Sequence, residues 1–230
     1  MAPDPMLVLV ASPALGPQMW RSTGDELSSR GWPVTYAPHV TTAPETVDDF
    51  ASALVTAIPT DHDVVLIPHS NAGLYVPAVV ERHQVVGAVF VDAGLPSRAG
   101  PTPLAPPHLY EFLRGRADTD GRLPPWTEWW DDADTAGLFP DAVVRRAVEA
   151  EQPRLPLSYF AGTVPTSRSW ERIPCGYLAF GDTYATECNQ AQDDGWPVRI
   201  IPGRHLHMLH DPAGVATVII ELLAASGITR

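Results

Sequence analysis

The residues best suited to chemistry surround Ser70, in the segment Asp63-Val-Val-Leu-Ile-Pro-His-Ser-Asn-Ala-Gly73. The short apolar run 64–67 predicts a fully buried strand, and the apolar segment 74–80 predicts a helix soon after the serine. A sharp turn between a strand and a helix lifts a serine hydroxyl above the sheet, where a base can reach it. The pattern therefore predicts that Ser70 is a nucleophile.

Such a turn is tight, so the residues two positions before and after the serine have to be small. Ala72 fits this requirement and Gly73 lies behind it. Pro68 occupies the other position, where glycine is usual. The match is good but incomplete.

A serine hydroxyl becomes reactive when a neighbouring base takes its proton, and that base is usually a histidine held in one tautomer by a carboxylate. The segment Pro202-Gly-Arg-His-Leu-His-Met-Leu-His-Asp-Pro212 places His205 after the last predicted strand, before the terminal helix. We expect His205 to be the base. His207 and His210 are better explained as supporting or surface residues, and His69 as a packing residue of the turn.

The carboxylate is expected in the loop that follows the strand before this histidine. The segment Phe180-Gly-Asp-Thr-Tyr184 offers Asp182 there, which gives the chain order Ser, Asp, His. Two rivals stay open: Asp92, at the end of the strand after the nucleophile helix, and Glu187, just beyond Asp182. Each of the three could instead cap a helix or lie in a loop.

Strand and helix patterns alternate along the chain, which favours a parallel sheet because each connection crosses over the sheet and returns. The predicted strands are 7–11, 34–38, 64–67, 86–91, 177–180 and 198–201. The predicted helices are 18–30, 44–57, 73–82 and 212–225, the last with Asp211 as N-cap and Pro212 at its first position. The fold class is therefore α/β, with a mostly parallel six-stranded sheet flanked by helices.

About 75 residues separate the fourth and fifth strands, far more than a normal connection. This segment has a proline-rich entry, several aromatic residues and an amphipathic helix near 142–151, which together predict a helical cap over the site. We expect one domain, 1–230, with a core of 1–95 and 172–230 and a cap insertion of 96–171. Trp126, Trp129, Trp130 and Tyr110 are candidate pocket residues, although they could equally close a small core beneath the cap.

Composition limits the partners. The chain has 230 residues, is 45% hydrophobic and carries a formal net charge of −12. A nucleic acid or an anionic membrane needs a basic surface, so neither is expected. A small-molecule substrate, either free or linked to a carrier or to CoA, is compatible with this charge. The chain shows no phosphate-binding glycine loop and no His/Cys metal spacing, so we expect no cofactor and no metal.

The N-terminal residues include Asp4 and no basic segment, so they do not resemble a secretory signal, and no apolar run reaches the roughly 18–20 residues of a membrane span. Two cysteines, Cys175 and Cys188, are too few for a disulfide framework. We therefore expect a cytoplasmic protein.

The order and spacing of these motifs resemble the α/β-hydrolase superfamily, in its small, cap-bearing esterase and hydroxynitrile-lyase-like branch. The motifs that carry the resemblance are Pro68-His-Ser-Asn-Ala-Gly73, Val91-Asp-Ala93, and Gly203-Arg-His205 before Asp211-Pro212. The resemblance covers nearly the whole chain and implies that the chain starts almost directly at the third strand of the full fold.

One departure from the family concerns the oxyanion hole. The resemblance implies one donor at the Asn71 N–H, after the nucleophile, and a second in the loop after the first strand. There, Ala11-Ser12 replaces the usual His-Gly pair and the donor position falls on Pro13, which has no N–H. Loss of one such donor costs on the order of 3 kcal/mol. Either the Ala14 N–H or the Ser12 hydroxyl substitutes, or the reaction forms no ordinary tetrahedral oxyanion.

Three functions follow. The first is hydrolysis of an ester, lactone or thioester of a small, largely apolar molecule by Ser70, His205 and Asp182. The second is a lyase or cyclase that uses the same residues as acid and base, which the Pro13 departure motivates. The third is a binding protein that has kept the fold without the chemistry.

Overall fold

Six parallel strands form the central sheet, in the order β2-β1-β3-β4-β7-β8, in a computed structural model that describes residues 4–38 and 42–230. The strands are β1 (Met6–Val10), β2 (Val34–Ala37), β3 (Val64–Ser70), β4 (Val85–Ala93), β7 (Cys175–Phe180) and β8 (Val198–Ile201). All six predicted strands are confirmed. β3 extends beyond the predicted end at residue 67, because Ser70 still pairs with Ala93 of β4.

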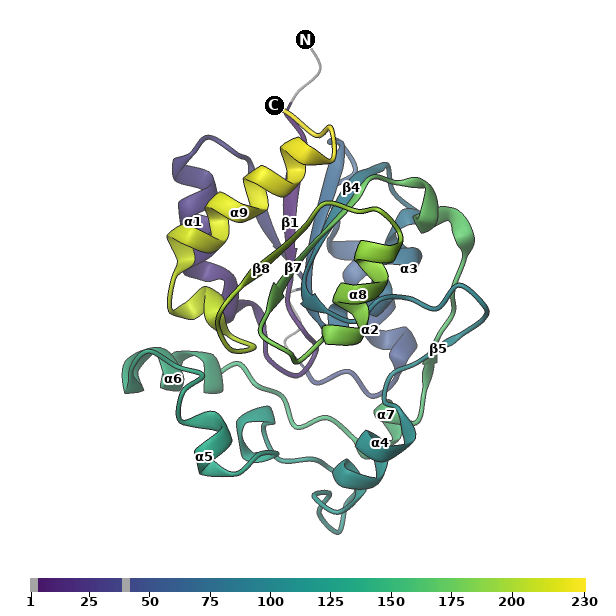
Figure 1. Cartoon of the computed structure of the whole chain (residues 1–230). Helices are drawn as coiled ribbons and strands as arrows, with labels where there is room; N and C mark the ends of the chain where they lie inside the picture. Colours follow the sequence, from purple (N-terminus) through teal and green to yellow (C-terminus); the bar gives the residue numbers. More distant parts are fainter. Residues whose placement is uncertain (1–3, 39–41) are drawn as a thin grey trace.

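Helices cover both faces of the sheet (Figure 1). The helices α1 (Arg21–Ser29) and α9 (Pro212–Ala225) lie together on one face. The helices α2 (Val47–Ala57), α3 (Val76–Val80) and α8 (Ala185–Asp193) cover the other. The Asp211 carboxylate accepts a hydrogen bond of 2.9 Å from the Gly214 N–H, so the predicted N-cap of the last helix is confirmed.

The central strands are apolar almost throughout, as expected for a parallel sheet covered on both faces. Every residue of β3 and β7 is buried. The side chains of the cysteines, one in β7 and one in α8, are buried and make no disulfide. Within the described ranges, no helix has the length and apolar character needed to cross a membrane.

A helical cap lies between β4 and β7, below the carboxyl ends of the strands in Figure 1. Its α-helices are α4 (Pro107–Arg114), α5 (Asp132–Thr135), α6 (Ala142–Glu149) and α7 (Leu157–Phe160), and it contains the 3-10 turns η3 (Trp126–Glu128) and η4 (Arg168–Arg172). The predicted helix near 142–151 corresponds to α6. A short antiparallel pair, β5 (Thr102–Pro103) and β6 (Thr163–Val164), joins the two ends of the cap and was not predicted.

Two hydrogen bonds are among the contacts that fasten the cap to the rest of the chain. The Glu151 carboxylate accepts a hydrogen bond of 2.6 Å from the Gln18 N–H in η1 (Pro17–Trp20). The hydroxyls of Tyr75 and Tyr159 are hydrogen-bonded to each other in the buried contact between η2 (Asn71–Tyr75) and α7. These contacts hold the cap over the carboxyl end of β3, where Ser70 lies.

Candidate active site

Ser70 lies on a sharp, strained turn between β3 and η2. Its φ of 57° and ψ of −133° fall outside the regions that non-glycine residues favour. The Gly94 N–H donates to the Ser70 carbonyl with a length of 3.0 Å, which ties the turn to the end of β4. The side chain is 8% exposed and faces a cavity. The surrounding structure therefore holds the hydroxyl in a fixed, accessible position.

The turn depends on the absence of a side chain at Gly73. A Cβ there would come within 2.1 Å of the Gly94 carbonyl oxygen. We expect Gly73→Ala to lower the free energy of unfolding by about 1–3 kcal/mol, because backbone has to move to relieve the overlap. Gly115→Ala is the matched control, since its Cβ would meet its nearest neighbour at 3.4 Å. Urea unfolding of both variants measures the difference, and equal stabilities would contradict the packing argument.

A line of hydrogen bonds connects Ser70, His205 and a buried carboxylate. The Ser70 Oγ lies 3.1 Å from His205 Nε2, and His205 Nδ1 lies 2.6 Å from Asp92 Oδ2. With Nδ1–H donated to Asp92, Nε2 carries a lone pair that can accept the Ser70 proton. Asp92 is fully buried and His205 is 9% exposed, so bulk water does not screen the pair strongly.

The carboxylate prediction was wrong in its first choice: Asp92, not Asp182, is the partner of His205. Asp182 is exposed in the loop after β7, whereas Asp92 Oδ1 accepts the Phe180 N–H at 3.0 Å while Oδ2 faces His205. Asp92 has a φ of 42°, and the neighbouring Ala93 N–H and carbonyl both bind the Tyr177 hydroxyl, at 3.1 and 2.7 Å. This clamp from β7 holds the bent end of β4 with the carboxylate under the histidine.

His69 supports the histidine from below. Its Nε2 is 2.9 Å from the His205 carbonyl oxygen, and the two rings lie 4.4 Å apart between centroids. Burial, and then the neighbouring His205, lowers the pKa of His69 well below its usual value, so the ring is neutral and its Nε2–H can donate. His207 and His210 stack on each other, and neither is among the lining residues of the cavity that Ser70 faces.

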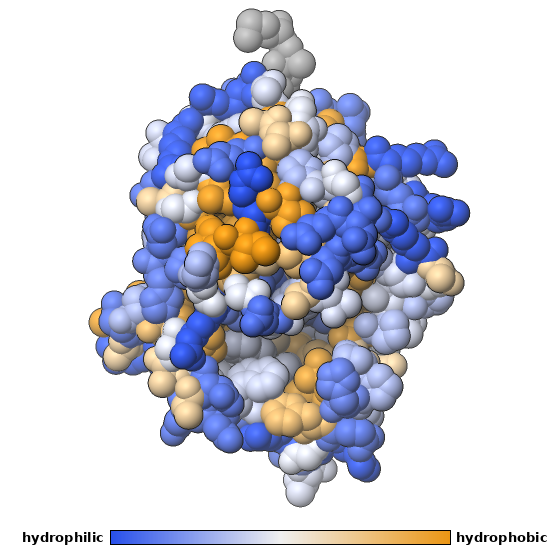
Figure 2. Space-filling model, in the orientation of Figure 1, coloured by the Kyte–Doolittle hydropathy of each residue, from blue (hydrophilic) through white to orange (hydrophobic). Residues whose placement is uncertain are grey.

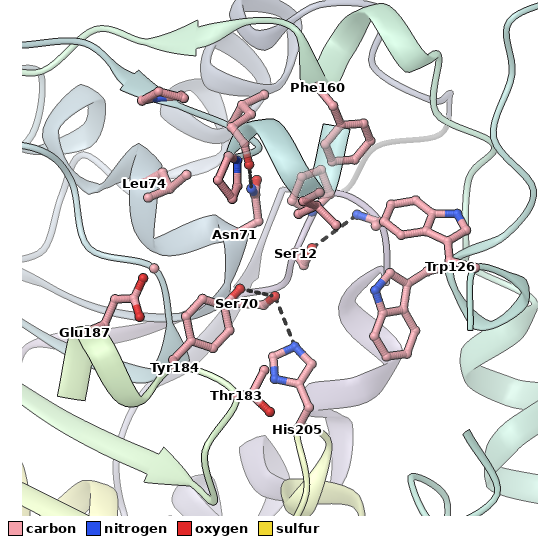
Figure 3. Close-up of a pocket in the computed structure, with 18 of the residues that line it drawn as sticks. Ser12, Ser70, Asn71, Leu74, Trp126, Phe160, Thr183, Tyr184, Glu187 and His205 are labelled. Atoms are coloured by element: carbon pink, nitrogen blue, oxygen red, sulfur yellow. Dashed lines mark hydrogen bonds between the residues drawn. The ribbon is translucent and has the colours of Figure 1, made fainter. Parts of the chain in front are cut away.

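Tyr184 is the site residue that the sequence reasoning missed. Its hydroxyl lies 3.1 Å from Ser70 Oγ, and its ring is tilted over His205 with 5.7 Å between centroids (Figure 3). It comes from the loop that was expected to supply the carboxylate. A tyrosine in a loop carries no pattern of its own, so no signal in the sequence pointed to it.

The loop after β1 contains the predicted oxyanion residues Ser12, Pro13 and Ala14, and the fourth, Asn71, is the first residue of η2. Ser12, Pro13, Ala14 and Asn71 all line the same cavity as Ser70. The Ala14 N–H does not point freely into the cavity but donates to Ser12 Oγ over a long 3.4 Å. Among the residues that the structure describes, the Ser12 hydroxyl proton has no acceptor. Ser12 is therefore available as a donor.

The cavity has a volume of about 830 Å³ and opens between the cap and the sheet, where Figure 2 shows the surface hollowed. Most of its wall is apolar, including Leu74, Leu95, Leu104, Leu109, Leu138, Trp126, Trp129, Trp130 and Phe160. The structure thus places the three predicted tryptophans in the wall. Tyr110 is corrected: the neighbouring His108 and Leu109 of α4 face the cavity, which turns Tyr110 away from it to pack against the core.

Glu187 is an acidic residue in this apolar wall. Burial, and then the charge of Asp92, raises the pKa of its carboxyl. As the pH rises through about 4.3, the Glu187 carboxyl therefore ionises in the unfolded chain before it ionises in the folded protein. The free energy of unfolding falls over this range, until the pH passes the pKa that Glu187 has in the folded protein. We expect Glu187→Gln to raise Tm at pH 7 by about 1–2 °C, since solvent screening limits the energy at a half-exposed group. Calorimetry at pH 7 and below pH 4 checks this, because the difference should vanish at the lower pH.

No protein-family model matches the chain, and no curated protein sequence matches it. Solved structures do. An extracellular α/β-hydrolase from a Paenibacillus species, described as sharing structural and functional homology with tobacco salicylic acid binding protein 2, is 19% identical with a TM-score of 0.72 and covers 96% of this chain and 99% of its own.

Two further solved structures match this chain over nearly its whole length. Tomato methylketone synthase I with 2-tridecanone is 16% identical with a TM-score of 0.72, and a pyrethroid hydrolase is 15% identical with a TM-score of 0.71. Both matches cover 99% of this chain and 100% of the other. At such identities the likeness establishes the fold and nothing finer.

Proposed function

We propose that this chain, which has the α/β-hydrolase fold, is a serine-dependent enzyme that hydrolyses an ester of a small, neutral, largely apolar molecule. The observation that carries the proposal is the continuous line from Ser70 Oγ to His205 and Asp92, with links of 3.1 and 2.6 Å, at the wall of an apolar cavity. A nucleophile, a base and an orienting carboxylate in this order are the parts that acyl transfer requires.

The first half of the reaction acylates Ser70. His205 Nε2 takes the hydroxyl proton as Oγ attacks the carbonyl carbon, and Asp92 stabilises the imidazolium that forms. The proton then passes to the leaving oxygen as its bond to carbon breaks. In the second half, water attacks the acyl-enzyme with His205 again as base, and the acid leaves with Ser70 restored.

The negative charge on the carbonyl oxygen needs donors that are already in place. The Asn71 N–H, directly after the nucleophile, is one. The Ser12 hydroxyl is the second, because Pro13 has no N–H and the Ala14 N–H is turned to Ser12 Oγ. In this arrangement Ala14 polarises Ser12, and Ser12 contacts the oxyanion.

The cavity wall indicates the substrate. It is mainly apolar, and its two acidic residues, Asp134 and Glu187, disfavour anions. Among the described lining residues none is lysine or arginine. A neutral ester or lactone therefore fits better than a CoA-linked thioester, whose phosphates would meet an acidic chain. We also propose a cytoplasmic location for the protein, where the free thiols of its two cysteines would stay reduced.

Intact-mass analysis after incubation with a small fluorophosphonate tests the proposal. The parent protein should gain one adduct, and Ser70→Ala and His205→Ala should gain none, because labelling requires an activated serine. His210→Ala, with the same change of side chain outside the site, should label like the parent. Absence of an adduct on the folded parent protein would refute the proposal.

The Pro13 departure favours a second candidate, a lyase or cyclase that uses Ser70 and His205 as acid and base without an acyl-enzyme. This reading predicts turnover that releases no carboxylic acid. Steady release of acid from simple esters, lost in Ser70→Ala, would exclude it.

A further inference from the structure

The hydroxyl of Ser70 has two partners, and only one belongs to the expected catalytic line. His205 Nε2 and Tyr184 Oη each lie 3.1 Å from Ser70 Oγ. Since Nε2 is the acceptor of the Ser70 proton, Oγ has to accept from Tyr184, and the phenol is the donor. Burial, the largest effect, raises the pKa of Tyr184, so the phenol keeps its proton across the neutral range.

The position of the phenol relative to the oxyanion residues decides what it can contact. In Figure 3, Tyr184 and Ser12 lie on different sides of Ser70. A carbonyl oxygen held by Asn71 and Ser12 points away from Tyr184. The leaving oxygen has to lie within reach of His205 Nε2, which returns the proton to it. The Tyr184 ring lies over His205, so the phenol and the imidazole approach the reacting carbon from the same side.

We propose that Tyr184 is a further catalytic residue, whose phenol hydrogen-bonds the leaving oxygen during acylation and the attacking water during deacylation. This inference rests on the proposed function and adds a role to the same site. When Oγ bonds to the acyl carbon it becomes a weaker acceptor, and the phenol donor is released toward the leaving oxygen. The phenol keeps its proton throughout, while the Ser70 proton reaches the leaving group through His205.

The role has a consequence for the kinds of ester that the enzyme cleaves. An alkoxide is a poor leaving group that gains from every donor, whereas a nitrophenolate leaves without a proton. The phenol should therefore matter most for alkyl esters. A tyrosine that only holds Ser70 in its resting position would affect both kinds of ester equally.

Tyr184→Phe tests the inference with ethyl butyrate and p-nitrophenyl butyrate, which form the same acyl-enzyme. We expect kcat/KM, which reports acylation, to fall about 10–100-fold for the ethyl ester, the effect of one hydrogen bond to a charged group. For the nitrophenyl ester it should fall less than about threefold. The deacylation rate should fall for both alike. Tyr110→Phe, the same substitution outside the cavity, should change none of these values, and melting temperatures confirm folding.

A second readout needs no turnover. Intact mass follows the rate at which Ser70 reacts with two phosphonates that differ only in an ethoxy or a p-nitrophenoxy leaving group. Selective slowing of the ethoxy reagent in Tyr184→Phe supports the inference. Equal slowing, or none, would overturn it while the proposed function stands. A parent protein that reacts with no phosphonate would overturn both.

Discussion

Asp92→Asn is expected to lower kcat/KM for ester hydrolysis by about 10⁴-fold, whereas Asp182→Asn should leave it unchanged. An amide at position 92 offers an N–H where His205 Nδ1 also has a proton, so the imidazole has to turn or change tautomer and Nε2 loses its lone pair. Asp182 is exposed in the loop after β7, and His205 Nδ1 is already hydrogen-bonded to Asp92. Initial rates with p-nitrophenyl butyrate compare the two variants.

The pair discriminates between two assignments of the carboxylate. A large loss in Asp182→Asn with little change in Asp92→Asn would mean that the loop after β7 rearranges in solution to supply the acid. Both proteins have to be checked for folding, because Asp92 is fully buried and also accepts the Phe180 N–H. Glu187→Gln adds a third arm for the remaining acidic candidate, and it should retain the parent's activity.

Ser12→Ala is expected to lower kcat by about 10²–10³-fold, the cost of losing one oxyanion donor. The reason is local: Pro13 offers no N–H, and the Ser12 hydroxyl is the donor that remains on that side of the cavity. Ser12→Thr keeps the hydroxyl and is the matched control, with most of the activity retained. Single-turnover kinetics separate this loss from weaker substrate binding.

The opposite result would also be informative about the loop. Removal of the Ser12 hydroxyl frees the Ala14 N–H, which is now directed at Ser12 Oγ. If Ser12→Ala kept full activity, Ala14 would be the oxyanion donor and the hydroxyl only its resting partner. Full activity would thus contradict the assignment made above.

The sheet was predictable because burial on both faces leaves a clear mark in the sequence. Strands such as β3 and β7 are short apolar runs bounded by polar or turn residues, and each was recognised. Ser70 was found because it ends such a strand, and His205 because it lies in the loop between the last strand and the terminal helix. The helix pattern of the cap was recognised too, at α6, but β5 and β6 have two residues each and show no periodicity.

The carboxylate was not predictable from the order of the elements. Asp92 and Asp182 both follow a strand, and a sequence does not tell which of two neighbouring strand ends lies closer to the histidine. That choice depends on the bent end of β4 and on the Tyr177 hydroxyl that holds it. The prediction that Tyr110 lines the pocket was wrong for a related reason, because the direction of a side chain on a short helix depends on packing.

The position of Asp92 on β4 also matters for protein engineering. Ser70 and Asp92 belong to the neighbouring strands β3 and β4, and His205 comes from the loop after β8. The loop after β7 therefore does not have to supply the carboxylate that binds His205. Library design can exploit this freedom: Thr183 and Thr186 line the cavity beside the reacting centre and can be randomised with Tyr184 retained. Variants selected from such a library can differ in substrate range while Ser70, His205 and Asp92 stay unchanged.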